Sequence, residues 1–238
     1  MEYGQFCPVA KAAELLGEKW TLLIVRELLY GSTRFSEFQR AISGISPTML
    51  NKRLKELESN GLVEKDDHDY QLTPAGKDLA PLVRQFAIWG MRWGRGNLPD
   101  CDLDVDLLLW DIRRRIKTEF LPETGAVIEV HITDLPDPSR WWLSVEACEA
   151  RPGDRDVQLS TEPPRTEVDL AIDSSLRALT EIWLGDITLH TALVRRQLTL
   201  QGMPLLIRSI ERWLPLARNA VFSERNLNPS AENVRLSS

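Results

Sequence analysis

Cysteine and histidine are scarce in this chain of 238 residues. The three cysteines, Cys7, Cys101 and Cys148, lie far apart, and no two of them form a CxxC pair. Cysteines in this number and spacing predict neither a disulfide framework nor a zinc site. The three histidines are scattered and none has an HExxH spacing, so we expect no metal site.

Long apolar runs are also absent. No run approaches the roughly 18 residues that a membrane span requires. The start Met1-Glu2 is acidic, whereas a secretory signal begins with a basic region. The sequence therefore predicts a cytoplasmic protein that does not contact the membrane.

Catalytic motifs are missing as well. The chain has no GxSxG nucleophile motif, no P-loop and no GxGxxG after a predicted strand. Its carboxylates form no pair that we can assign to acid–base roles. The sequence thus indicates no catalytic residue, no cofactor and no enzyme.

Hydrophobic residues make up 43% of the chain and charged residues 27%, which is ample for packed cores. Residues 94–100 are rich in Gly and Pro and mark a linker. We predict a first domain over residues 1–95, a linker over 96–102, a second domain over 103–218 and a flexible tail over 219–238. Residues 1–95 hold 13 Lys and Arg against 12 Asp and Glu, whereas the remainder holds 16 against 23. The acidic excess therefore lies in the second domain.

Residues 34–60 have the pattern of a helix-turn-helix. A short helix over residues 35–42 is followed by a turn with Gly44 and by a second helix that opens with Ser46-Pro47. Ser is a favoured N-cap, and Pro suits the first helical position because its missing N–H would be unpaired there. Leu50, Leu54 and Leu57 form a buried stripe on this second helix, which extends to residue 59.

The other faces of that helix carry polar side chains suited to DNA. In a helix-turn-helix the second helix enters the major groove, where Asn pairs with adenine and Lys with guanine. The candidate DNA-binding residues are Arg34, Ser46, Pro47, Thr48, Asn51, Lys52 and Lys55. The alternative is an ordinary solvated helix face, but the helix-turn-helix pattern favours DNA contact.

A short hairpin, the wing, is predicted next. Residues 62–65 and 70–72 flank the acidic turn at residues 66–69. Thr73-Pro74 then begins a predicted long helix with apolar residues that include Leu82, Phe86 and Trp89. We infer that this helix and a helix over residues 9–16 pair two subunits in a homodimer.

These segments resemble the HxlR-type winged helix-turn-helix regulators over residues 5–93. The resemblance depends on ordered motifs such as Gly17-Glu18-Lys19-Trp20, Gly44-Ile45-Ser46-Pro47 and Leu72-Thr73-Pro74-Ala75-Gly76. It implies a homodimeric transcription factor, a repressor or an activator, that binds double-stranded operator DNA through residues 46–59. The acidic turn departs from the family's more basic wing, and its three carboxylates would repel phosphate.

Cys7 occupies the position at which several members of this family carry a redox-sensing cysteine. A sensing thiol needs nearby positive charge or a helix N-terminus, and Cys7 directly precedes a predicted helix. A Cys7-based redox regulator is therefore one alternative function, and a structural cysteine is the other interpretation.

The second domain is predicted to be α+β. Strands are expected over residues 128–132, 141–145, 157–159 and 168–172, and helices over 105–118, 174–184 and 204–214. Residues 168–214 resemble the closing portion of sterol-carrier-protein-like domains, whose strand, helix, Gly-Asp turn, strand and final helix enclose an apolar tunnel. This resemblance implies a lipid or another apolar small molecule as effector. The chain also has eight tryptophans, most of which we expect in the core because aromatic rings bury large areas. Trp110, Trp141 and Trp183 are the candidates for residues that line a pocket instead.

Three functions therefore remain open. The leading one is a ligand-modulated, dimeric DNA-binding regulator, and the Cys7-based redox regulator is the second. The third is a carrier of lipids or other apolar ligands whose helix-turn-helix serves protein contact. For the second domain itself, support of the dimer without ligand is the alternative to ligand binding.

Overall fold

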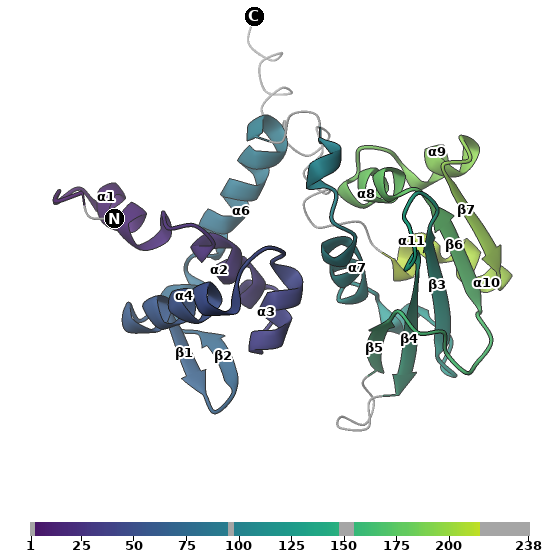
Figure 1. Ribbon diagram of the computed structural model, residues 1–238, viewed down its shortest axis with the longest axis horizontal. Coiled ribbons are helices and arrows are strands. Elements are labelled where there is room, and N and C mark those ends of the chain that lie inside the picture. Colours follow the sequence, from purple (N-terminus) through teal and green to yellow (C-terminus); the bar gives the residue numbers. More distant parts are fainter. Residues whose placement is uncertain (1–2, 95–97, 148–154, 215–238) are drawn as a thin grey trace, which may run out of the picture. The chain divides into compact units, whose positions relative to one another are not determined.

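The computed structural model describes residues 3–94, 98–147 and 155–214 (Figure 1). The contacts divide the chain into two compact units, Met1–Gly96 and Asn97–Ser238. Residues 96 and 97 of the predicted linker and the whole predicted tail, residues 219–238, lie outside the described residues.

The first unit is mostly helical and contains a two-stranded wing. Its core contains Ile24 and Val25, Phe38, and Leu50 and Leu54, all fully buried. The antiparallel wing pairs Val63 with Leu72. The elements in chain order are α1 (Pro8–Leu16), α2 (Thr21–Leu29), α3 (Phe35–Ala41), α4 (Pro47–Ser59), β1 (Val63–Asp66), β2 (Asp69–Leu72), α5 (Pro74–Lys77), α6 (Ala80–Trp89) and the π-helical η1 (Gly90–Gly94).

The long helix predicted to follow the wing is interrupted. It is divided into the single turn α5 and the longer α6, and Asp78 and Leu79 lie between them. Pro81 explains the break, since it has no N–H to donate to the carbonyl of Lys77 and its ring crowds that carbonyl. Proline is accommodated instead in the first turn of α6.

The second unit contains a five-stranded mixed sheet with the strand order β5-β4-β3-β6-β7. Strands β3 and β6 are parallel, and every other neighbouring pair is antiparallel. The elements are η2 (Asp100–Asp102), α7 (Val105–Arg113), η3 (Thr118–Phe120), β3 (Ala126–Ile132), β4 (Arg140–Ala147), β5 (Arg155–Ser160), β6 (Leu170–Ser174), α8 (Leu176–Leu184), α9 (Leu189–Val194), β7 (Leu198–Gly202), α10 (Pro204–Arg208) and α11 (Ile210–Trp213).

One face of this sheet forms the core. Alternate residues of β3, including Ile128, Val130 and Ile132, are buried, as the period of a strand requires. Side chains of α7, α8 and α11 join the same apolar cluster, among them the fully buried Trp213. A sheet-containing second unit was predicted, although β6 begins two residues later than expected, at Leu170.

Two helices predicted in this unit are shorter than expected. After α7 ends, the Lys117 N–H donates to the Trp213 carbonyl at 2.8 Å, so it is not available to continue the helix. The last helix is divided into α10 and α11 at Ser209, whose hydroxyl donates to the Leu205 carbonyl at 2.8 Å. Such a bond from Ser to the preceding turn bends helices.

Candidate functional site

The start of α4 is fixed by its cap. The Ser46 hydroxyl accepts a hydrogen bond from the Met49 N–H at 3.2 Å, and Pro47 occupies the first turn. Gly44 in the preceding turn has a φ of 78°, a conformation that Gly adopts without the steric cost of a Cβ atom. The sequence therefore positions the first turn of α4 at the molecular surface.

The two sides of α4 have different roles. Leu50, Leu54 and Leu57 are buried in the core of the first unit. The candidate DNA-binding side chains of this segment are all exposed: Ser46, Pro47, Thr48, Asn51, Lys52 and Lys55. Lys52 lies 3.9 Å from the Glu56 carboxylate, an exposed pair that contributes little to stability. This exposed face is therefore available for contact with a partner.

Arg53, which the sequence did not single out, holds α4 in place. Its side chain is 8% exposed and lies 2.9 Å from Glu18 and 2.5 Å from Glu56. Its Nε also donates to the Lys19 carbonyl at 3.1 Å. Position 53 follows Leu50 by three residues, on the buried stripe, so this spacing could have been used to predict its burial.

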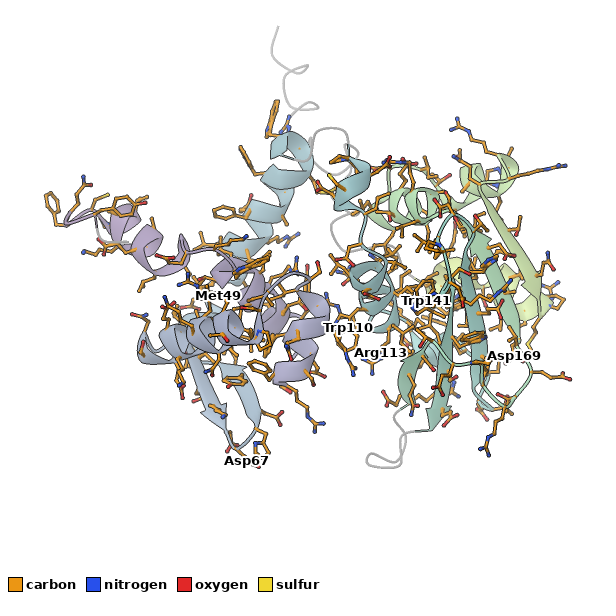
Figure 2. The ribbon with its side chains drawn as sticks, viewed as in Figure 1. Met49, Asp67, Trp110, Arg113, Trp141 and Asp169 are labelled. Atoms are coloured by element: carbon orange, nitrogen blue, oxygen red, sulfur yellow. The ribbon has the colours of Figure 1, made fainter. Side chains whose placement is uncertain are left out.

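Arg34 lies beside the wing, directly before α3. Its Nε is 3.6 Å from Asp69 Oδ1, and the Thr33 hydroxyl donates to the same oxygen at 3.0 Å. Asp67 is at the tip of the wing (Figure 2), with its side chain 85% exposed. Arg34 is thus exposed at the surface next to acidic rather than basic groups.

Helices α1 and α6 carry apolar side chains that the first unit does not bury. Both extend away from its body (Figure 1). Phe86 and Trp89 of α6 are each 61% exposed, and Phe6 and Val9 at the start of α1 are more exposed still. Such exposed apolar surface is typical of protein–protein contact.

Helix α1 also carries Glu14. Hydrogen bonds from Lys11 and from the Tyr3 N–H lower the pKa of Glu14.

Cys7 precedes α1 at the N-cap position and is a free, half-buried thiol. Its carbonyl accepts the first backbone hydrogen bond of the helix, from the Lys11 N–H at 3.0 Å. The structure therefore locates Cys7 on the same segment as the exposed Phe6 and Val9.

The second unit contains an apolar cavity of about 370 Å³. Trp183 lines this cavity, whereas the candidates Trp110 and Trp141 are not among its lining residues and are buried on α7 and β4 (Figure 2). The Trp183 Nε1 donates to Asp111 at 2.9 Å. The remaining lining residues are Ile112, Leu179, Ile182, Gly185, Ile187, Thr188, Leu189, Ile210, Glu211 and Leu214.

Residues 3–94, 98–147 and 155–214 contain neither a candidate metal site nor a helix that could span a membrane. Over these ranges, no three His, Cys, Asp or Glu residues gather in a way that could bind a metal ion. None of the helices within them has both the length and the apolar character needed to cross a bilayer.

The first unit is similar to known regulators. The family model "HxlR-like helix-turn-helix" matches residues 15–97. The HTH-type transcriptional regulator YvaP of Bacillus subtilis is 40% identical over 101 residues, which span 39% of this chain and 94% of YvaP. An HTH-type transcriptional regulator of Methanothermobacter thermautotrophicus is 36% identical, over 37% of this chain and 72% of that protein. Quinone-bound YodB from B. subtilis is 39% identical over 37% of this chain and 100% of YodB, with a TM-score of 0.35.

Proposed function

Because this chain belongs to the HxlR-like helix-turn-helix family, whose members are transcriptional regulators, we propose that α4 is its recognition helix and binds operator DNA. The observation that carries this proposal is the exposed polar face of α4, whose side chains the core does not need. Thr48, Asn51 and Lys52 contact base edges, and Lys55 and Arg34 contact phosphates. Ser46 and Pro47 hold the first turn of the helix toward the groove.

The regulator acts as a homodimer in this proposal. Helix-turn-helix regulators are typically dimeric, because two recognition helices bind two half-sites. The exposed apolar residues of α1 and α6, including Phe86 and Trp89, supply surface that a second subunit would bury. A twofold axis would bring the same residues of both subunits together.

The second unit binds an apolar effector in this proposal. Strand β6, helix α8, Gly185-Asp186, strand β7 and the final helices occur in the order found in sterol-carrier-like domains, with α9 inserted before β7. Apolar side chains dominate the lining of the cavity beside α8, and ligand sites are typically concave and apolar. An effector would regulate DNA binding only if its affinity differs between the states that do and do not bind DNA.

The experiment is an electrophoretic mobility shift with the purified protein and the DNA upstream of its own gene. We expect specific binding that Asn51→Ala and Lys52→Ala each weaken by about 1 to 3 kcal/mol, as for the loss of a base contact. The matched controls are Asn60→Ala at the opposite end of α4 and Lys77→Ala on α5, both exposed. These controls should leave the affinity unchanged.

Two results would count against α4 as the recognition helix. One is equal weakening by the variants and by their controls, which would indicate a nonspecific charge effect. The other is the absence of a sequence-specific shift on the upstream DNA and on a wider set of operators across salt concentrations. The second result would favour the carrier of apolar ligands.

A further inference from the structure

The cavity of the second unit has one charged side chain among its lining residues within the described chain, and that charge is negative. Glu211 of α11 stands beside walls formed by Ile112 of α7, Leu179 and Ile182 of α8, and Ile210 of α11. Its own side chain is exposed. The cavity thus combines mainly apolar walls with one exposed acidic residue.

The Glu211 carboxylate does not take part in the side-chain interactions that stabilise the described part of the fold. In the described part of the chain it has no hydrogen bond or salt bridge to another side chain. The hydroxyl of Thr188, another polar group of the lining, already has hydrogen-bond partners. Its Oγ1 accepts the Thr191 N–H at 3.1 Å and lies 2.8 Å from the Thr191 hydroxyl. Glu211 is therefore the polar group that a ligand in this cavity would meet.

Two guanidinium groups beside lining residues of the cavity have interaction partners. Arg115 lies 3.3 Å from Asp111 and over the ring of Trp183, 5.5 Å from its centroid. Arg212, next to Glu211 in the chain, lies over the Phe120 ring at 4.8 Å. An anionic ligand such as a fatty acid would meet the like-charged Glu211 among the lining residues.

We propose that the cavity binds a hydrophobic monocation, an apolar body with one amine or quaternary ammonium group whose charge faces Glu211. The walls bury the apolar body, and the carboxylate is complementary to the cationic end. The proposal rests on the proposed effector function of the second unit and names the chemical class of its ligand.

Isothermal titration calorimetry of the full chain tests this class with three probes that share a decyl chain: decyltrimethylammonium, decanol and decanoate, each below its micellar concentration. We expect the cation to bind about two- to fivefold more tightly than the alcohol, the range of an exposed ion pair. Decanoate should bind most weakly. Glu211→Gln should reduce the affinity for the cation to that for the alcohol and leave decanol binding unchanged.

A matched pair of variants tests the location. Leu214→Trp adds bulk at the cavity wall and should abolish binding of all three probes. Leu205→Trp makes the same change at an exposed position outside the lining and should not alter binding. Equal effects of the two variants would overturn the assignment to this cavity.

The remaining outcomes distinguish a failure of the proposed ligand class from a failure of the proposed effector function. Equal affinity for the cation and the alcohol, tightest binding of decanoate, or no effect of Glu211→Gln would each overturn the cationic class while leaving an apolar effector in place. No binding of any probe, as would follow if a second copy of the chain filled the cavity, would overturn both. Calorimetry is performed without DNA, so a failure of operator binding is detected independently.

Discussion

The two units place their candidate functional groups in opposite ways. In the first unit, a single continuous helix, α4, exposes polar side chains on a convex surface. In the second unit, residues of four helices, α7, α8, α9 and α11, line a cavity of about 370 Å³. A convex surface contacts a large, rigid partner such as DNA, whereas a concave apolar cavity suits a small molecule. The proposed division between DNA binding and ligand binding follows this difference.

The largest expected effect concerns the apolar surface of α6. Leu82→Asp should dissociate the proposed homodimer, since each buried Leu contributes about 1.5 to 3 kcal/mol and a twofold interface contains two copies. Leu205→Asp is the matched control in the second unit, because the two leucines are 49% and 55% exposed. Sedimentation velocity measures the oligomeric state. If the two variants sediment identically, the dimer surface is not on α6.

The next effect concerns the attachment of α4. Arg53→Met removes the hydrogen bonds to Glu18, to Glu56 and to the Lys19 carbonyl while it preserves much of the side-chain volume. We expect the free energy of unfolding of the first unit to fall by about 2 to 3 kcal/mol. Urea denaturation measures this, with the exposed Lys52→Met as its control. An equally small loss in both variants would show that Arg53 does not hold α4 in place.

A smaller effect is expected at the wing. Asp67 at the tip is exposed and negatively charged, so Asp67→Asn should raise DNA affinity by less than about 1 kcal/mol as repulsion from phosphate falls. The gain should shrink at high salt, because ions screen exposed charges. Titrations by fluorescence anisotropy at two salt concentrations provide the measurement. Weaker binding by this variant would instead indicate that the Asp67 carboxylate contributes directly to DNA recognition.

The smallest expected effect is at Cys7. Under reducing conditions, Cys7→Ser should change DNA affinity by less than about 0.5 kcal/mol, as for a substitution away from the contact surface. The same gel shift after hydrogen peroxide treatment tests the redox alternative. If peroxide releases the wild-type protein from DNA but not the Cys7→Ser variant, Cys7 is a sensor and the effector cavity is not the sole input.

The difference between the units also explains what the sequence could predict. Features of α4 that depend on neighbouring residues were predicted correctly: the Ser46-Pro47 start, and the burial of Leu50, Leu54 and Leu57. The break before α6 could also have been expected, because Pro81 alone causes it. Local signals of this kind are sufficient to predict a candidate functional surface that a single helix forms.

The cavity could not be predicted in this way. Its walls include Ile112, Leu179 and Ile210, which are far apart in the chain and meet only through the packing of α7, α8 and α11. An abundance of Trp indicated a pocket, but of the three candidates only Trp183 lines it. Two partners of Arg53, Glu18 and the Lys19 carbonyl, are also distant in the chain, since they lie in the segment between α1 and α2.

Arg53 has a consequence for how such a regulator could acquire a new operator. Thr48, Asn51 and Lys52 can be exchanged without loss of core packing, so mutations there could alter the preferred DNA sequence at little cost in stability. Arg53 is basic and lies on the same helix, yet its contacts with Glu18 and Lys19 bind it to the fold. Libraries designed to change operator preference should therefore vary the three exposed positions and keep Arg53 constant.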